Sequence, residues 1–545
     1  LLNKLNKRNY PVYFQKERLS LHGNVKVILE TPDLTNQELN QMHNVSVVRL
    51  EDYFLNDFEL LESRLEEFWA PDQYFKEFLN ESKNHLSNFL EICVEHCDPM
   101  IASDTITIEN NFLNLFQGIL KTVFDEDIRW MTNSDCISKL SFFCSLWAVF
   151  STISKEEKKM VDDCLRKSGS SVPVFGTVFD FYIDKETFEW EHWRKNIKEW
   201  KYDPHFPHSS IYIQTIDYLR CKYFFNIMLR QGKNVLLVGP KGSGKTSIIR
   251  EFLMNFEHSN YHIISIQVCH NTTPNQIFES IVKFTEKKSK DEVQPIGGKK
   301  LLLYLDDINL DEKSPLNEAL KFFWENKFWL IDGKKVHISD IVVLASEAMD
   351  MDSRPRYISS SRKCFQCLNL DKVSEKDITN IYQTILRGKF LDFEVNIKFL
   401  TLSIVKGTIG TFNTIRDWFQ EKNLISTMFT INDIKKVICG VLRSHKDCHD
   451  TKFEVVQLWV NEVLRTFRDR MMDIEAEDEV VDIVRKQTKK VFNLSFDDIC
   501  EYEEISEPPR FGNILDTYGF YTDLDDDELL EYLNKKVEEY NEEEE

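Results

Sequence analysis

Positive charge is scarce in this sequence. Its 545 residues include 68 Lys and Arg against 90 Asp and Glu, which gives a formal net charge of −22. Sequence-independent affinity for nucleic acid comes from Lys and Arg side chains that replace the counterions condensed on the phosphate backbone. A chain with the opposite balance repels such a polyanion. We therefore expect no nucleic-acid partner.

Long apolar runs are absent as well. The most apolar stretch, residues 137–153, is interrupted by Lys139 and several serines, and it is shorter than the roughly 20 residues that a membrane-spanning helix needs. The chain begins Leu-Leu-Asn-Lys, with neither an initiating Met nor a signal-peptide pattern. The sequence predicts no membrane segment, and its start indicates a piece cut from a longer chain.

An extracellular pattern of paired cysteines is also missing. The 12 Cys residues are scattered among apolar neighbours in a long chain, which favours reduced, buried thiols and a cytosolic compartment. Cys364 and Cys367 have the spacing of a redox or zinc motif, but they lie in a segment, 364–370, that is typical of a strand. Because no second Cys pair lies nearby, packing in a core is favoured over metal binding.

Two further groups have half of a zinc-site pattern, and neither has a matching half at a suitable spacing. The groups are Cys93, His96 and Cys97, and His445, Cys448 and His449. We expect no metal at either group.

The composition that remains is that of a folded protein. Hydrophobic residues make up 42% and charged residues 29% of the chain, which is ordinary for globular proteins. A chain of this length exceeds a single hydrophobic core, and the usual domain size predicts about three or four folding units.

The spacing of apolar residues predicts the organisation of the first 207 residues. Residues 1–50 contain two short apolar strands, 25–29 and 45–50, as at the end of an α/β unit. Residues 57–167 have helical spacing with few Gly or Pro. The stretch 168–207, with its Gly, Pro and Trp residues, predicts an irregular connector.

The second half of the chain has a different pattern. From 208 to about 370, strand and helix patterns alternate, which predicts a parallel sheet with crossover helices on both faces. Amphipathic helices are then expected at 374–387, 396–405, 431–443 and 454–472, and a short acidic helix with a solvated tail at 523–545.

The strongest chemical signal is a glycine-rich loop between a strand, 235–238, and a helix, 247–255. Its residues are Gly239, Pro240, Lys241, Gly242, Ser243, Gly244, Lys245 and Thr246. A phosphate-binding loop requires this context, which disfavours the alternative of a plain Gly-rich turn. Backbone N–H groups would surround the phosphates of ATP or ADP, Lys245 would reach the β- and γ-phosphates, and Thr246 would bind Mg²⁺.

Two carboxylates form the second signal. The apolar strand 301–305 ends in Asp306 and Asp307. A buried strand that delivers a carboxylate to its C-terminal end is the arrangement that holds Mg²⁺ opposite a phosphate-binding loop. Asp306 is the candidate metal ligand, and Asp307 is the candidate catalytic group that polarises the attacking water. An acidic turn is the alternative for this motif taken alone.

Three segments in a fixed order carry a resemblance to a known family. They are the segment 211–220, the glycine-rich loop 239–246, and Asp306-Asp307-Ile308-Asn309. This order resembles the third AAA+ module of dynein heavy chains, particularly the axonemal ones. The stretch 173–184 with Trp190 and Trp193 is similar to the linker that enters that module, and 458–470 is similar to a helix of its small domain.

The resemblance implies an α/β fold: a P-loop AAA+ core with a parallel sheet and flanking helices, a helical small domain after it, and a helical subdomain of the previous module before it. The expected parts are the end of the preceding large domain (1–50), its helical small domain (51–167), a linker (168–207), the AAA+ large domain (208–372), its small domain (373–515) and an acidic helix toward the next module (516–545).

The same resemblance implies partners and a location. Neighbouring AAA+ modules of the same heavy chain are the expected direct partners. Dynein intermediate and light chains and microtubules would be reached through parts outside this stretch. The expected location is the cytoskeleton of a cilium, the axoneme.

Departures from the family pattern concern the sensing of the nucleotide. Glu347 stands where family members offer a polar Asn to the γ-phosphate, and a carboxylate there would repel the phosphate. Asn432 stands where the family carries an Arg that reaches the nucleotide, and it supplies no charge. Asp307 also reaches less far than the Glu common at this position.

An arginine that completes the neighbouring second module's site is expected near Arg356. Arg356 and Arg362 are the candidates, and ordinary surface arginines are the equally weighted alternative.

Three functional hypotheses follow. The leading one is a regulatory module that binds ATP or ADP with Mg²⁺ and hydrolyses slowly or not at all. The second is an active ATPase that needs an arginine from the next module. The third is a structural ring spacer with a vestigial phosphate loop.

Overall fold

The computed structural model describes the backbone of residues 12–14 and 17–19 and most of residues 58–544. The gaps in that second range are 68, 70–71, 102, 125–129, 131–132, 168–171, 209–210, 270, 290, 309–314, 332–333, 350–361, 423–428, 500–509 and 517. The chain divides into two compact units, Leu1–Leu60 and Leu61–Glu545, and each is described by itself.

The first unit contains a small hairpin. Strand β1 (Val12–Phe14) pairs antiparallel with β2 (Glu17–Leu19), so that Val12 lies opposite Leu19. The strands predicted at 25–29 and 45–50 lie outside the described residues.

The second unit opens with helices, as the spacing predicts. They are α4 (Gln73–His96), α5 (Thr105–Thr122), α6 (Ser134–Phe150) and α7 (Lys155–Lys167), preceded by α3 (Glu59–Glu66) at the boundary between the units. Asp72 and Asp104 cap α4 and α5, because their carboxylates accept hydrogen bonds from the N–H groups of Phe75 and Thr107. Helix α6 is buried along nearly its whole length and packs against both α4 and α5.

The connector that follows is more regular than predicted. Strand β3 (Phe181–Ile183) pairs antiparallel with β4 (Trp190–His192) between two short 3₁₀ helices. The buried Trp193 stacks on Tyr182 at 4.6 Å between ring centroids. The prediction of an irregular segment was wrong here, because these strands are too short for alternation to be visible.

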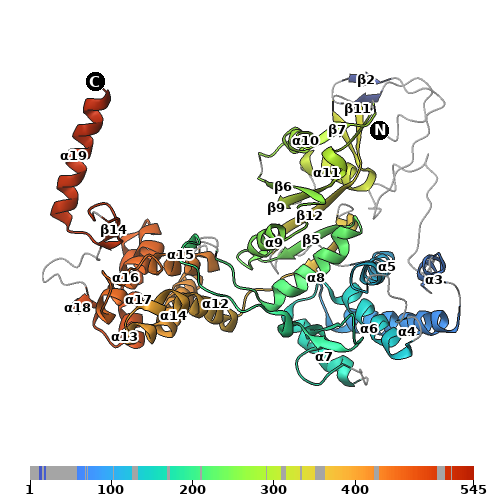
Figure 1. The fold of residues 1–545 in the computed structure, drawn as a ribbon, viewed down its shortest axis with the longest axis horizontal. Helices are drawn as coiled ribbons and strands as arrows, with labels where there is room; N and C mark the ends of the chain where they lie inside the picture. Colours follow the sequence, from blue (N-terminus) through green and yellow to red (C-terminus); the bar gives the residue numbers. More distant parts are fainter. Residues whose placement is uncertain are drawn as a thin grey trace. The chain divides into compact units, whose positions relative to one another are not determined.

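A five-stranded parallel sheet forms the middle of the chain (Figure 1), as predicted. In spatial order its strands are β13 (Phe365–Asn369), β5 (Asn234–Gly239), β12 (Ile341–Ala348), β9 (Lys300–Asp306) and β6 (Tyr261–Gln267). Its central strands are continuous apolar runs because helices cover both faces. The flanking helices include α8 (Ile216–Arg230), α9 (Lys245–Met254), α10 (Pro274–Val282) and α11 (Pro315–Asn326).

A second, four-stranded sheet was not predicted. Its order is β10 (Phe328–Ile331), β11 (Lys334–Ile338), β8 (Glu292–Pro295) and β7 (Thr285–Lys287). Two of its pairings are antiparallel and one is parallel. Strands of three to five residues carry little periodic signal, so pattern reasoning passes over them.

A second group of helices follows the parallel sheet, as predicted. It comprises α12 (Glu375–Lys389), α13 (Val395–Lys398), α14 (Leu400–Glu421), α15 (Ile431–Val441), α16 (Lys452–Phe467), α17 (Ile474–Phe492) and α18 (Phe496–Ile499). Trp459 of α16 is fully buried in their shared core, and its indole N–H donates to the Thr408 hydroxyl at 2.9 Å.

The C-terminal segment is tied to these helices through a buried carboxylate. Glu462 of α16 accepts hydrogen bonds from the Tyr521 hydroxyl and from Arg465, both at 2.8 Å. Tyr521 lies between the paired short strands β14 (Phe511–Gly512) and β15 (Thr522–Asp523), ahead of the predicted acidic helix α19 (Asp526–Glu544).

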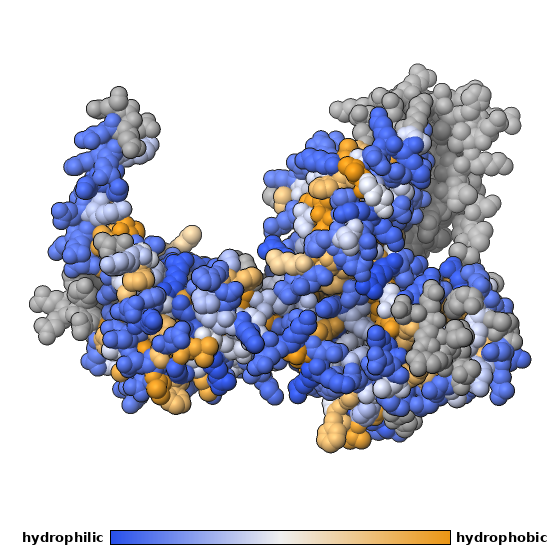
Figure 2. All heavy atoms as spheres, viewed as in Figure 1, coloured by the Kyte–Doolittle hydropathy of each residue, from blue (hydrophilic) through white to orange (hydrophobic). Residues whose placement is uncertain are grey.

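The face seen in Figure 2 is mainly hydrophilic, in keeping with the charged composition. Within the described ranges, no helix combines the length and apolar character that crossing a membrane takes. The described cysteines are free thiols. Cys367 is buried in the core beneath the sheet, and burial raises the pKa of its thiol to about 12.

Gly118 marks the close approach of α5 to α8. A Cβ atom at Gly118 would lie 2.3 Å from the Cγ2 atom of the buried Ile227 and 2.0 Å from the Gln231 amide. We expect Gly118→Ala to destabilise the protein, because overpacking at a buried contact costs about 1–3 kcal/mol and outweighs the roughly 1 kcal/mol gained in helix propensity. The free energy of unfolding in denaturant measures the difference.

The matched control is Gly410→Ala in the middle of α14. There the nearest atom to an added Cβ is the end of the flexible Gln487 side chain, at 3.2 Å. This variant should be neutral or more stable than the natural protein. Equal effects of the two substitutions would contradict the close packing of α5 on α8.

Candidate nucleotide-binding site

The glycine-rich loop lies where the sequence predicts it, between β5 and α9. Gly244 caps α9 with φ +94°, a left-handed conformation that favours glycine. Only glycine fits at position 239, because a Cβ atom there would lie 2.2 Å from the Leu370 carbonyl oxygen. The loop therefore holds its shape through residues without side chains, at the N-terminus of a helix that favours anions.

Lys245 points back into the loop. Its side chain is only 5% exposed, and its ammonium group donates to the carbonyl oxygens of Gly239 at 2.8 Å and Pro240 at 2.9 Å. The buried hydroxyl of Ser243 has no hydrogen-bond partner among the described residues. A loop that presents an ammonium group and an unsatisfied hydroxyl fits the phosphate chain of a nucleotide.

Asp306 is the polar centre of the site. At the end of β9 it is 4% exposed, and its Oδ1 atom accepts hydrogen bonds from Thr246 at 3.1 Å and from Ser346 at 2.7 Å. The Ser346 hydroxyl in turn accepts a hydrogen bond from the Asp307 N–H at 2.9 Å. Thr246 and Asp306, predicted as a pair from different elements, are thus brought together, and their oxygens are of the kind that Mg²⁺ prefers.

Asp307 lies at the turn that follows β9. Its φ of +55° is in the left-handed region, which Asp tolerates better than most residues. Burial raises the pKa of its carboxyl group, the neighbouring Asp306 raises it further, and Lys245 and Lys241 oppose the shift. Asp307 therefore holds a proton more readily than an ordinary aspartate.

The side chain of Glu347 points away from the face of the sheet that carries Asp306, contrary to the sequence analysis. Ser346 and Glu347 are consecutive on β12, so their side chains point to opposite faces of the sheet. Ser346 faces Asp306, whereas Glu347 lies beside Val238, whose side chain belongs to the apolar core on the other face. The expectation that its carboxylate faces and repels the γ-phosphate was wrong.

The charge of Glu347 is also compensated. Its side chain is 3% exposed, and its two oxygens accept hydrogen bonds from Arg362, Nη2 at 2.6 Å and Nε at 3.1 Å. This bidentate geometry is the strong form of an Arg–carboxylate pair. Glu347 therefore anchors Arg362, which begins the short 3₁₀ helix Arg362–Cys364 just before β13.

A pocket adjoins the loop and is lined by residues of the loop, of the segment before α8, and of helices α8, α9, α12 and α15. Its empty space is about 1060 Å³, open solvent at its mouth included. Its lining includes Gly242–Gly244 of the loop and apolar side chains, among them Ile211, Ile213 and Ile381. Asn432 and Lys435 of α15 complete the wall. A phosphate-binding loop beside apolar side chains suits a nucleotide.

Comparisons with known proteins agree with this geometry. Residues 200–371 match the family described as the P-loop containing dynein motor region, residues 72–195 match the dynein heavy chain AAA lid domain, and residues 414–504 match the AAA+ lid domain. The chain belongs to the dynein heavy-chain family. It carries an AAA+ module of the motor region, and this family assignment, made from motif order, is confirmed.

Individual relatives are ciliary and flagellar dyneins. Dynein axonemal heavy chain 2 of Mus musculus is 30% identical over 411 residues, which is 73% of this chain and 9% of that protein. The dynein-1-beta heavy chain of the flagellar inner arm I1 complex of Chlamydomonas reinhardtii is 27% identical over 69% of this chain and 9% of its own length. The chain thus spans about a tenth of these relatives, which assign it to the cytoskeleton of a cilium.

Two residues of this dynein site, Ser346 and Lys435, escaped the sequence analysis. Ser346 was passed over in favour of Glu347, although strand alternation limits the site-facing position to one of the two. Lys435 lies three residues after Asn432 on α15, a spacing that places two side chains on one helix face. The site therefore has a cation on α15 even though Asn432 supplies none.

Of the two arginines predicted to reach the neighbouring dynein module, the structure describes one. Arg356 lies outside the described residues. Arg362 is described, and its guanidinium group is buried against Glu347 within its own module. The role of either arginine at a neighbouring site stays a prediction.

The pairing of Arg362 with Glu347 gives a test of its structural role. We expect Arg362→Ala to lower the free energy of unfolding by about 3–5 kcal/mol, because an uncompensated carboxylate is left buried. Replacement of both residues by Met should recover most of this loss, since removing both charges together leaves none unpaired. Urea unfolding of the two variants measures this, and an Arg362→Ala variant of natural stability would contradict the pairing.

Proposed function

We propose that this chain is a regulatory nucleotide-binding AAA+ module of an axonemal dynein motor, which binds ATP or ADP with Mg²⁺ and hydrolyses ATP slowly or not at all. The observation that carries the proposal is the loop 239–246, with the buried Lys245 at its centre and the Asp306–Thr246 pair beside it. The family match implies nucleotide binding in general, and which nucleotide is bound belongs to the proposal.

Each residue of the loop has a definite part in binding. The N–H groups at the start of α9 and the Lys245 ammonium group neutralise phosphate charge. Thr246 and Asp306 would hold Mg²⁺, which when bound neutralises charge on the phosphate oxygens. Ile211, Ile213 and Ile381 offer the apolar surface on which a purine base packs.

Weak hydrolysis is inferred from the residues that stand where the family carries its catalytic and sensing groups. Asp307 is a short general base compared with Glu, and Asn432 brings no charge to the pocket. Tight binding without a well-placed base lowers the energy of the bound ground state and does little for the chemical step. Such a site retains its nucleotide and suits regulation of the motor better than force production.

An active ATPase is the second candidate, and two observations favour it. Glu347 is turned away and neutralised, so it does not oppose the phosphate. Lys435 of α15 lines the pocket where Asn432 lacks a charge. An arginine supplied by a neighbouring module would then complete the site, and such arginines raise rates by large factors in P-loop enzymes.

The proposed partners and setting follow from the family. Neighbouring AAA+ modules of the same heavy chain are implied by the match to motor and lid regions. Intermediate and light chains and microtubules are proposed as partners of the longer protein, and not of the surfaces described above.

Lys245→Ala tests nucleotide binding. A hydrogen bond to a charged group contributes roughly 1.5–3 kcal/mol, so loss of the ammonium group should weaken ATP and ADP binding by about 10- to 100-fold. Isothermal titration calorimetry with Mg²⁺ measures this. Lys283→Ala, an exposed lysine at the end of α10, is the matched control and should bind as the natural chain does. Failure of the natural chain to bind either nucleotide at millimolar concentration would favour the structural ring spacer, and equal binding by all three proteins would contradict the role of Lys245.

Hydrolysis is tested separately under single-turnover conditions. Enzymes turn over at a median of about 10 s⁻¹, and we expect this module, in a chain that includes the following module, to fall at least about a hundredfold below that rate. Rapid quenching followed by separation of ATP from ADP gives the rate constant. Fast turnover that is lost in Asp307→Asn would show the active ATPase instead.

A further inference from the structure

A second hollow lies beside the nucleotide pocket, where the start of α7, the connector and the start of α12 meet. Its empty space is about 1690 Å³, open solvent at its mouth included. It shares part of its wall with the nucleotide pocket, including Thr215, Asp217 and Asp377, but the phosphate-binding loop does not reach it. Its lining contains seven cationic side chains and four carboxylates, and we call it the basic hollow.

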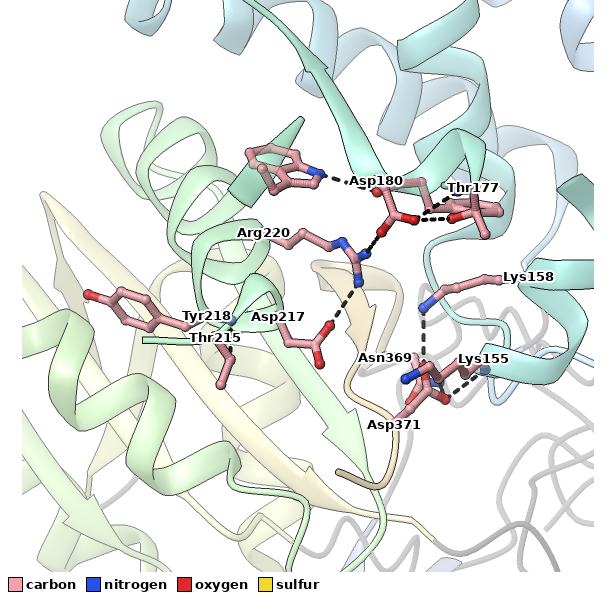
Figure 3. A network of polar contacts seen from close by, with 12 residues as sticks. Lys155, Lys158, Thr177, Asp180, Thr215, Asp217, Tyr218, Arg220, Asn369 and Asp371 are labelled. Atoms are coloured by element: carbon pink, nitrogen blue, oxygen red, sulfur yellow. Dashed lines mark hydrogen bonds and ion pairs between the residues drawn. The ribbon is translucent and has the colours of Figure 1, made fainter. Parts of the chain in front are cut away.

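Three of the four carboxylates are occupied by contacts within the hollow's own walls (Figure 3). Arg220 donates to Asp180 at 2.6 Å and to Asp217 at 2.8 Å. Asp371 accepts from the Lys155 N–H at 3.0 Å and pairs with Lys158 at 3.3 Å. These contacts leave little negative charge free to face the space between the walls.

The fourth carboxylate is occupied as well. Asp377 accepts a hydrogen bond from the hydroxyl of Ser374, the residue that caps α12. Each of the four acids thus has a contact in the walls, and seven positive against four negative side chains leave the hollow with a net charge of about +3.

Most of the cations have no such partner. Within the described part of the chain, five of the seven form no ion pair with a carboxylate, whereas Lys158 and Arg220 do. The five are Lys155, Lys159, Arg194, Lys372 and Lys376. In a chain whose net charge is −22, this local excess is the reverse of the general balance. Like charges gathered around one space repel one another, and a bound anion removes that repulsion.

The walls add to the positive potential through their backbone. Helices α7, α8 and α12 all begin at the basic hollow, since Lys155, Ile216 and Lys376 line it near their first turns. The N-terminus of each helix carries about half a positive charge. This contribution supplements the side chains and is not the basis of the inference.

We propose that the basic hollow binds a small, multiply charged phosphorylated anion, at a site distinct from the phosphate-binding loop. A polyphosphate suits it better than a single carboxylate, because five cations around an open space match several charges at once. A long nucleic-acid strand does not suit it, because the surrounding chain is strongly acidic. The inference is independent of whether the loop binds ATP or hydrolyses it.

Inorganic tripolyphosphate is the probe, measured by isothermal titration calorimetry against the full chain in the Lys245→Ala background, which weakens the loop. The test variant adds Lys159→Ala, Lys372→Ala and Lys376→Ala. The control adds Lys398→Ala, Lys406→Ala and Lys490→Ala, which remove the same charge from exposed positions on the second group of helices. Thermal unfolding of each variant checks that it is folded.

We expect the Lys245→Ala protein and the control variant to bind tripolyphosphate equally. The test variant should bind it at least about tenfold more weakly, since charge-assisted contacts are lost. Binding should also weaken as salt is raised, because the cations are exposed. The inference is overturned if the test and control variants bind alike, or if Lys245→Ala alone abolishes binding. A further variant keeps Lys245 and carries only the other three substitutions of the test variant. Its affinity for nucleotide reports on the phosphate-binding loop separately.

Discussion

The site depends on the position of one carboxylate, Asp306, at the carboxyl end of a buried parallel strand. Its hydrogen bonds from Thr246 and Ser346 join β9 to α9 on one side and to β12 on the other. Because the strands are parallel, their carboxyl ends meet at one edge of the sheet, beside the start of the helix that follows β5. The apolar runs that hold these strands in the core are therefore also what brings the phosphate-binding loop and the metal-binding oxygens together.

On strand β12, two consecutive residues have different roles because their side chains point to opposite faces of the sheet. Ser346 faces the nucleotide side, and Glu347 faces the apolar core, where Arg362 satisfies it. A carboxylate in a core is unfavourable unless it is paired and hydrogen-bonded. Its partner, Arg362, lies in the 3₁₀ helix just before β13, the edge strand, so the pair joins β12 to the segment that leads into this edge of the sheet.

Polar contacts also join parts of the chain that lie far apart in sequence. At the end of β13, Asn369 donates hydrogen bonds from its backbone N–H to the Ser151 carbonyl and from its side-chain amide to the Ile153 carbonyl, just after α6. Asp371 pairs with Lys158 of α7. These contacts hold the exit of the sheet against the first group of helices (Figure 3). The same arrangement leaves several lysines facing one hollow, so an anion there would touch both the first helices and the entry to the second group.

The sequence by itself determined the local elements and the loop chemistry. The run 235–238, the glycines, Lys245 and the pair Asp306-Asp307 are encoded in short segments whose periodicity and spacing are visible without a structure. Tertiary structure decided what depends on register and distant contacts: the face to which Glu347 points, its pairing with Arg362, the place of Lys435, and the four-stranded sheet. A strand pattern does not say which of its two faces meets a particular partner, because that choice is made by the pairing of segments far apart in the chain.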